Sequence, residues 1–492
     1  MRLILKSLLL SLASLAGVAG VARGQTGADG TLLRVQISAA AAEARPGNRP
    51  AVAQTLQMLL KEAEKAHDDR ATAEAQLALA RIVLEADYES GEVVAVEPMP
   101  LLESALEKCS AFGWKTLRME ALELHAQCLG EIDEPVSACR ELELAASLGL
   151  DLGLVDAAVD SLLQAGRVYA NLGHAVRVRQ IWTLLQLVRR QRHGQYSTET
   201  AARIDRAAVQ FDDVLALTPA PQSVPEPGVL LQPLRSAVVV ANSEAEDGRT
   251  RFLLINQSAF STEGDLSILA DKAGVKSWQA GQAGHFVHLD PAAKKQATNR
   301  HLRLLPGQQL RIFLEHLPSG RTEFADKVAL TWTDADGARQ ADCEFRFDAA
   351  ASGRSQVING SIVRGQAAWP APLYHELFFR GNGSVVENFL ARTSVPCRLE
   401  MYREATGELV AVDAQGDGVF TGPGDHIAPG HDRDAEGRPD LILTGLTSGS
   451  LEIFALPLQG DAQSAALTIQ LADYSASPPR WREDATDSVV AP

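Results

Sequence analysis

Acidic and amide side chains are concentrated in two short glycine-containing segments in the last fifth of the chain. Each segment places oxygen-bearing side chains two residues apart and follows them with glycine, which permits a sharp turn. Calcium is a hard cation that takes six to eight oxygen ligands, so side chains at this spacing could converge on one ion. The sequence therefore predicts calcium ligands at Asp413, Gln415, Asp417 and Asp425 in the first segment, and at Asp432, Asp434, Glu436 and Asp440 in the second.

The second segment resembles the calcium loops of integrin-type β-propeller repeats. The first resembles the EF-hand-like loop of dockerins, although Gln415 and the position of Asp425 depart from that pattern. Both resemblances imply calcium, and the spacing does not decide between one shared ion and two. Asp and Gly are also common turn formers, so ordinary hairpin turns are the alternative.

The remainder of the chain carries no recognised catalytic constellation. It contains no GxSxG, HExxH, phosphate-binding loop or dinucleotide-binding glycine motif. His375 and Glu376 begin like a zinc-protease motif, but the second histidine is missing. Asp413 and Asp417 could serve as a glycosidase pair only if they flanked a substrate cleft at a defined separation. We therefore expect a protein that is not an enzyme.

Before about residue 218, apolar residues recur every three or four positions, which is the spacing of amphipathic helices. Successive helices joined by short turns pack antiparallel, so residues 25–218 are expected to form an α-solenoid. The predicted helices are 31–44, 50–67, 70–86, 98–111, 115–131, 134–148, 154–172, 175–192 and 197–216.

The stretch from Leu162 to Leu185 resembles a tetratricopeptide repeat, with matching positions at Gly166, Tyr169, Gly173, Val178, Trp182 and Leu185. A similar pattern lies 40 residues earlier, whereas such repeats usually recur every ~34 residues. The resemblance covers about residues 70–192 and implies a tetratricopeptide-like fold. An irregular helical bundle is the alternative.

A proline-rich linker is predicted at 219–228, and beyond it apolar and polar residues alternate as in antiparallel strands with one buried face. We expect an immunoglobulin-like β-sandwich over 229–354, a second β-sandwich over 355–474 and a disordered tail over 475–492. The fold class is therefore multidomain α plus β. Residues 370–472 resemble the bacterial pre-peptidase C-terminal domain, which implies an accessory module.

Two predicted strands show this alternation most clearly. One places Val328, Leu330 and Trp332 on a single face before an Asp-Gly turn at 334–337. The other alternates apolar with polar residues in the order Cys397, Arg398, Leu399, Glu400, Met401 and Tyr402.

The N-terminus has the form of a secretory signal peptide. Arg2 and Lys6 precede an apolar run from Leu8 to Ala22, which is short for a spanning helix. We expect residues 1–24 to be removed, with an uncleaved anchor as the alternative. The mature chain is then extracytoplasmic, periplasmic or secreted, with no transmembrane segment.

The net charge and the cysteine count exclude one class of partner and one class of scaffold. The formal net charge of −16 argues against nucleic acid, which requires a concentrated basic surface. Five cysteines in 492 residues do not form a disulfide-dense scaffold. Cys128 and Cys139 lie on the two helices of one predicted hairpin and could form a disulfide or remain buried thiols.

We expect an exported, non-enzymatic binding or scaffold protein that holds a protein or peptide partner through the helical groove, with calcium-stabilised β modules. Groove candidates are the polar residues His125, Gln164 and Arg167. The first alternative is a carbohydrate- or cell-wall-binding protein, for which the available aromatics are Trp369, Tyr374 and Tyr402. The last is a hydrolase with an unfamiliar site. The sequence does not identify the partner.

Overall fold

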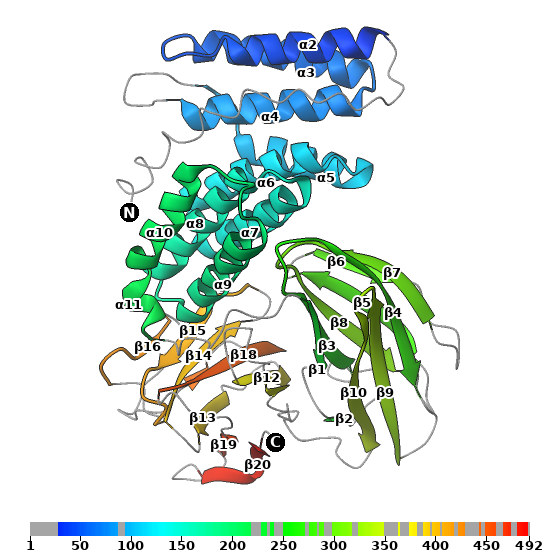
Figure 1. Cartoon of the computed structure of the whole chain (residues 1–492), viewed down its shortest axis with the longest axis vertical. Coiled ribbons are helices and arrows are strands. Elements are labelled where there is room, and N and C mark those ends of the chain that lie inside the picture. Colours follow the sequence, from blue (N-terminus) through cyan, green and yellow to red (C-terminus); the bar gives the residue numbers. More distant parts are fainter. Residues whose placement is uncertain are drawn as a thin grey trace. The chain divides into compact units, whose positions relative to one another are not determined.

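The computed structural model describes most of the helical region and the strands that follow it (Figure 1). The described residues are 28–86, 94–217, 228–233, 237–240, 249–270, 275–282, 285–289, 298–316, 323–348, 363–364, 373–380, 387–393, 396–403, 406–417, 422–428, 442–443, 448–458, 466–473 and 480–490. The predicted signal segment 1–24, linker residues 219–227 and the acidic segment 432–440 lie outside them. The chain forms two compact units, Met1–Lys108 and Cys109–Pro492.

The first unit consists of helices around one small apolar core. It contains α2 (Ala28–Ala42), α3 (Arg49–Lys65), α4 (Asp69–Glu85) and most of α5 (Pro98–Phe112). Ile37, Leu56 and Leu79 are buried together between α2, α3 and α4. The side chain of Asp68 accepts a hydrogen bond from the backbone N–H of Ala71 at 2.9 Å and so caps the start of α4.

The second unit begins with a group of helices in which the first four contact their neighbours in sequence order, whereas the fifth packs on the third and the sixth on the fourth (Figure 1). They are α6 (Lys115–Glu131), α7 (Pro135–Leu152), α8 (Val155–Asn171), α9 (Ala175–Gln191), α10 (Thr198–Gln210) and α11 (Asp212–Leu215). The predicted helix 197–216 is therefore divided at Phe211. The Phe211 ring packs on Gly166, where a Cβ would lie 2.7 Å from a ring carbon, so the small residue makes room for the aromatic one.

The helix-to-helix turns repeat with a period of 20 residues. Gly113, Asp133, Gly153 and Gly173 all have positive φ, between 68° and 77°. The residue after each turn donates its backbone N–H to the carbonyl five positions earlier, as follows: Trp114 to Cys109, Glu134 to Leu129, Leu154 to Gly149 and His174 to Tyr169. This arrangement satisfies carbonyls that a helix end would otherwise leave unpaired. The hairpin repeat is thus 40 residues long, as the sequence pattern predicts.

The β region begins at Val229 and comprises antiparallel sheets, except that β2 and β10 pair in parallel. Its first strands are β1 (Val229–Pro233), β2 (Ala237–Val240), β3 (Arg249–Asn256), β4 (Thr262–Ala270), β5 (Val275–Gln282), β6 (His285–Leu289), β7 (Thr298–Leu304), β8 (Gln309–His316), β9 (Glu323–Asp334) and β10 (Gly337–Asp348). They form two five-stranded sheets, in the orders β1-β3-β8-β5-β6 and β2-β10-β9-β4-β7. Asp334 pairs with Gly337 across the β9–β10 turn, so the predicted Asp-Gly hairpin is confirmed.

The later strands form a six-stranded sheet, β11-β12-β18-β14-β15-β16, and a four-stranded sheet, β17-β13-β19-β20. They are β11 (Val363–Arg364), β12 (Leu373–Arg380), β13 (Glu387–Thr393), β14 (Cys397–Arg403), β15 (Leu409–Asp413), β16 (His426–Ile427), β17 (Ile442–Leu443), β18 (Ser448–Pro457), β19 (Ala466–Asp473) and β20 (Arg480–Val490). Within the segment expected to be a disordered tail, β20 pairs with β19, which supplies partners for its backbone groups.

Strand β14 departs from the predicted single buried face. Cys397, Leu399 and Met401 are buried, but Arg398, Glu400 and Tyr402 on the opposite face are buried as well. The reason is that α9 begins against this second face, where the Val176 N–H donates to Glu400 Oε2 at 3.1 Å. A strand covered on both sides can hold polar residues only if they find hydrogen-bond partners there.

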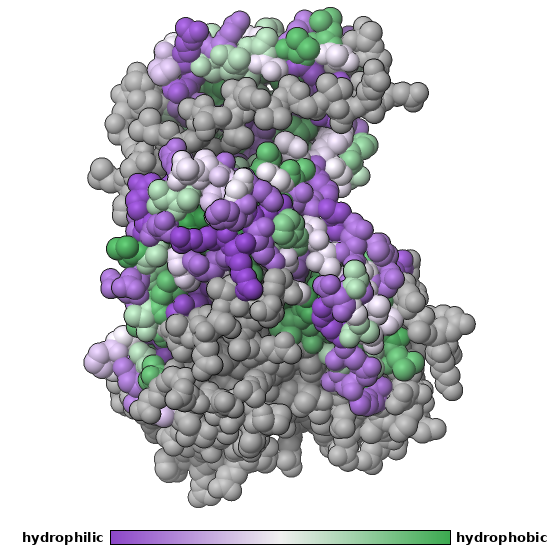
Figure 2. All heavy atoms as spheres, viewed as in Figure 1, coloured by the Kyte–Doolittle hydropathy of each residue, from purple (hydrophilic) through white to green (hydrophobic). Residues whose placement is uncertain are grey.

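None of the helices in the described ranges is both long enough and apolar enough to cross a bilayer. On the face shown in Figure 2, hydrophilic side chains gather over the helices of the second unit, and apolar ones form smaller patches between them.

Candidate functional site

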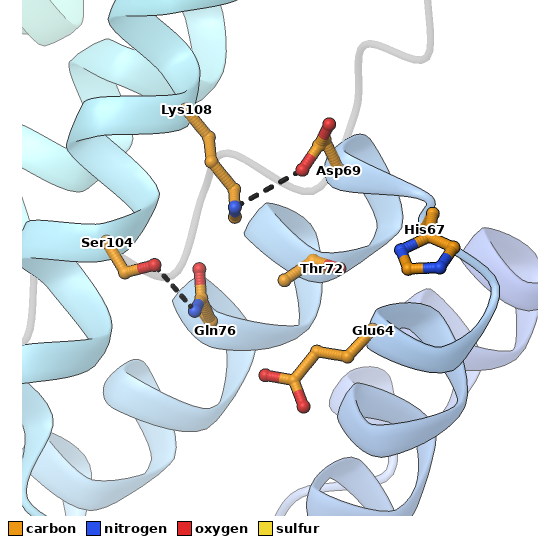
Figure 3. A pocket seen from close by; sticks show the side chains of 7 residues that line it. All are labelled: Glu64, His67, Asp69, Thr72, Gln76, Ser104 and Lys108. Carbon is orange, nitrogen blue, oxygen red and sulfur yellow. Dashed lines mark hydrogen bonds and ion pairs between the residues drawn. The ribbon is translucent and has the colours of Figure 1, made fainter.

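A polar pocket of about 280 Å³ lies among α3, α4 and α5 in the first unit (Figure 3). Its lining residues come from the end of α3, the turn that follows it, the first half of α4 and the middle of α5. They are Glu64, His67, Asp69, Thr72, Gln76, Ser104 and Lys108.

Two pairs of polar residues position the pocket. Thr72 and Gln76 lie one turn apart on α4, and Ser104 and Lys108 lie one turn apart on α5. Gln76 Nε2 donates to Ser104 Oγ at 3.0 Å, and Lys108 Nζ lies 3.2 Å from Asp69 Oδ1 (Figure 3). These two contacts join the helices on either side of the pocket and leave its lining polar.

Gln76 is the most unusual member of the lining. The residue is only 5% exposed, and its Oε1 has no hydrogen-bond partner among the described residues. A buried acceptor without a partner costs about 1–3 kcal/mol. In Figure 3 the nitrogen of this amide is directed to Ser104, and its oxygen is turned toward the side of the pocket that holds Lys108. The oxygen is therefore a buried acceptor in the pocket wall that no donor of the described residues pairs.

The open side of the pocket carries charge. Glu64 and His67 are exposed, and His67 occupies the α3–α4 turn with a φ of 52°. With His67 neutral, two carboxylates (Glu64 and Asp69) face one ammonium (Lys108), which leaves one net negative charge. Thr72 donates its hydroxyl hydrogen to the Asp68 carbonyl at 2.8 Å, so toward the pocket this oxygen can only accept.

The first acidic segment forms a turn that is closed by backbone hydrogen bonds. Asp413 is buried at the end of β15, and its Oδ1 accepts from the N–H groups of Gln415 at 3.2 Å and Gly416 at 2.6 Å. Asp425 accepts from Ala414 N–H at 2.7 Å and from Gly422 N–H at 2.5 Å. Both carboxylates thus stabilise the turn directly.

Gln415 donates its Nε2 to the Pro423 carbonyl at 2.7 Å, and Asp417 is exposed. Nowhere in the described ranges do three His, Cys, Asp or Glu side chains come close enough to hold a metal. Asp432, Asp434, Glu436 and Asp440 lie outside those ranges. Calcium binding therefore stays a prediction from the sequence.

Two of the groove candidates, His125 and Arg167, have structural partners. His125 Nδ1 lies 3.7 Å from Glu141, and Arg167 donates to Gln210 at 3.2 Å. Tyr402 is fully buried and cannot offer its ring to a glycan. Cys128 and Cys139 are buried free thiols, and burial raises the pKa of Cys128 to about 12.

Sequence reasoning did not identify the pocket. The available signal was the four-residue spacing of Thr72 and Gln76, and again of Ser104 and Lys108, on helices whose other inward positions are apolar. That signal becomes specific only when α4 and α5 are known to be neighbours, because a polar pair on a helix face is otherwise a solvated surface.

No protein-family model matches the chain, and no curated protein matches it. Among solved structures, it is similar to the N-terminal domain of PorA, with 14% identity over 25% of this chain and 98% of that one and a TM-score of 0.17. It is similar to the YadV chaperone, with 9% identity over 54% of this chain and 97% of that one and a TM-score of 0.16. It is also similar to a CsuC–CsuE chaperone–tip adhesion subunit complex of Acinetobacter baumannii, with 12% identity over 52% of this chain and 97% of that one and a TM-score of 0.15. TM-scores this low assign neither a fold nor a function to this chain.

Proposed function

We propose that this chain is an exported, non-enzymatic binding protein whose helices hold a protein partner. The observation that carries the proposal is the pocket among α3, α4 and α5, with the partnerless Gln76 oxygen in its lining. Protein interiors pair nearly all of their buried polar groups, and among the described residues that line this pocket Gln76 carries the buried atom left without a hydrogen-bond partner. A donor supplied by a partner would satisfy this acceptor.

The finer fold belongs to the same proposal. Turns that recur every 20 residues favour a tetratricopeptide-like solenoid, an architecture that presents extended surfaces to peptides and helices. The sheets of the β region favour two β-sandwich modules that act as spacers. The apolar run Leu8–Ala22 favours export through a signal peptide.

Calcium is proposed for the second acidic segment, where Asp432, Asp434, Glu436 and Asp440 recur around a glycine. The first segment uses Asp413 and Asp425 to bind backbone N–H groups, which is the chemistry of a turn. A calorimetric calcium titration tests the assignment. We expect heat of binding for the parent chain and none for the D432A/D434A variant.

Site-specific photo-crosslinking in the full chain tests the binding function. A benzophenone amino acid replaces exposed His67 at the open side of the pocket, and a control chain carries it at exposed Arg206 on α10. We expect a discrete light-dependent adduct from position 67 in the native extracytoplasmic fraction, none from position 206, and loss of the adduct when Gln76→Leu is added. The same products from both positions would contradict the proposal.

A further inference from the structure

We infer that the pocket lined by Gln76 takes a cationic side chain, a guanidinium or ammonium group carried on a peptide segment of the partner. This inference rests on the proposed function and specifies the chemistry of the same site. It follows from the hydrogen-bonding groups that remain free, from the charge of the lining and from the volume.

The free groups deep in the pocket accept hydrogen bonds. Gln76 Oε1 lacks a donor, and the Thr72 hydroxyl has already given its hydrogen to the Asp68 carbonyl. The Gln76 amide nitrogen is held by Ser104. An incoming group must therefore bring hydrogens, and a ligand with acceptors alone would leave the buried oxygen unpaired.

Charge favours a cation over a neutral donor. Asp69 is paired with Lys108, whereas Glu64 adds a second carboxylate at the open side of the pocket. Glu64 and Asp69 against Lys108 leave one negative charge that a cation would neutralise. A carboxylate or phosphate drawn by Lys108 would instead meet Glu64 and the Gln76 oxygen, both of which repel it.

Shape and size favour a side chain. A volume of about 280 Å³ is close to the lower end of the range for drug-sized ligand pockets, roughly 300–1,000 Å³, and can hold one long side chain. A guanidinium presents five donors in a rigid plane. Gln76 lies deep in the pocket and Glu64 lies at its open side, so one planar group has acceptors at two depths to satisfy.

Fluorescence anisotropy with the full chain tests the inference. The probes are labelled Gly/Ser nonapeptides with one central Arg, Lys, citrulline, Leu or Glu. Citrulline keeps the planar shape of Arg but is neutral, and a carbonyl oxygen replaces one of the two NH2 groups, so it has three donors instead of five. We expect Arg, and more weakly Lys, to bind at least about 10-fold more tightly than the other three. Equal or tighter binding of the Glu peptide would overturn the inference, as would binding by none of the five.

Variants of the pocket separate recognition from folding. We expect Gln76→Leu to weaken the Arg peptide about 10-fold and Gln76→Glu, which keeps an acceptor there, to retain it. Glu64→Gln should weaken Arg but not citrulline, and Glu62→Gln on the exposed side of α3 should change neither. An unchanged Arg affinity in Gln76→Leu would overturn the inference, with circular dichroism confirming that each variant is folded.

Agmatine serves as a free small amine without a peptide. Affinity equal to that of the Arg peptide would overturn the peptide origin and assign the pocket to a soluble amine. If the crosslink at position 67 is present but no cation preference is found, only this inference fails. If the crosslink is also absent, the proposed binding function fails with it.

Discussion

Two of the carboxylates at which the helices of the second unit contact the β region have different surroundings. At the end of α7, Asp151 accepts hydrogen bonds from Lys115 at 2.7 Å, from Ser261 at 2.5 Å and from Arg303. Lys115 and Arg303 are 42% and 46% exposed, so water reaches the cations of this first junction. The Asp151 side chain is itself 2% exposed, so the exposure of this junction is that of its cations. Exposed cations lose little when their ion pair is broken.

The second junction is closed to water. Glu400 on β14 is fully buried and accepts from Arg398 at 2.8 Å, from Tyr402 at 2.5 Å and from Val176 N–H at 3.1 Å. The His174 ring contacts the ring of Tyr402 at the same junction, with the ring centroids 5.3 Å apart. A buried ion pair can stabilise only when all of its partners are present, because each unpaired charge there carries a full desolvation penalty. The two junctions should therefore respond differently to substitution and to acid.

The largest expected effect is at Glu400. Glu400→Ala removes three acceptor contacts and leaves Arg398, which is 6% exposed, without its carboxylate. We expect the free energy of unfolding to fall by about 3–5 kcal/mol, as for other broken buried pairs. Urea denaturation measures the loss, and hydrogen exchange at the Val176 amide reports whether the junction opens.

Glu408→Ala is the matched control, because Glu408 lies near the same strands but its side chain is 45% exposed. Its Oε2 is 3.8 Å from Arg403 Nε, a longer contact than those of Glu400. Its removal should cost less than about 1 kcal/mol. Equal losses for the two variants would show that burial of Glu400 does not distinguish the second junction.

The next effect is acid sensitivity at His174. Burial, reinforced by the positive charges of Arg177 and His426, lowers the pKa of His174 from 6.5 to about 3. The folded chain therefore keeps this imidazole neutral while the unfolded chain takes up a proton below about pH 6.5. Stability is full above that pH and declines as the pH falls toward 3, by about 2 kcal/mol between pH 7 and pH 5.

Denaturation of the parent and of His174→Phe at both pH values checks this decline. Phenylalanine preserves an aromatic ring next to Tyr402 and cannot titrate. The variant should lose the difference between pH 7 and pH 5, and an unchanged pH dependence would exclude His174 as its source.

A smaller effect is expected from Asp151, and at lower pH. Burial raises the pKa of this carboxyl, but hydrogen bonds from Lys115, Ser261 and Arg303 outweigh it and lower the pKa to about 2. A lowered carboxyl pKa stabilises the fold above about pH 4 and loses that contribution as the pH falls toward 2. We expect a loss of about 1 kcal/mol by pH 3.

Asp151→Asn should abolish that acid-dependent component and leave the decline between pH 7 and pH 5 intact. The comparison needs only the two variants, Asp151→Asn and His174→Phe, measured over one pH series. If both removed the same phase, the two junctions would form a single electrostatic unit.

The smallest effect concerns the turns next to the junctions. Gly153 follows Asp151 and Gly173 precedes His174, with φ values of 77° and 75° and open space around both Cα atoms. Alanine at either position should cost about 1 kcal/mol from backbone strain alone. Asp133→Gly should gain a similar amount, and differential scanning calorimetry can rank the three. A larger loss at Gly173 than at Gly153 would show that its turn is coupled to Glu400.

The sequence predicted those features of the fold that depend on residues close to one another in the chain, namely the positions of helices and turns. The spacing of apolar residues located the helices to within a few residues, and the Asp-Gly turn at 334–337 was predicted because its chemistry is contained in four residues. Burial of Glu400 was not predictable, because the N–H that pairs with it lies 224 residues away in the sequence.

The candidate sites likewise combine features visible in the local sequence with features that depend on distant residues. Oxygen donors at Asp413 and Asp425 were visible in the sequence, but carboxylate spacing does not show whether backbone N–H groups or a cation will meet them. The Gln76 pocket depends on an oxygen that lacks a partner, and no sequence pattern encodes such a lack.

The 20-residue rhythm of turns at Gly113, Asp133, Gly153 and Gly173 limits how this protein can change in length. Deleting one helix with its turn would reverse the direction of every later helix and carry the α9 start, with Val176, to the opposite edge of the row, away from Glu400. Deleting or duplicating two would restore the direction. We therefore expect insertions and deletions in this region to be tolerated only as pairs of helices. Only such a pair leaves Val176 at the side of the helices where it contacts Glu400 on β14.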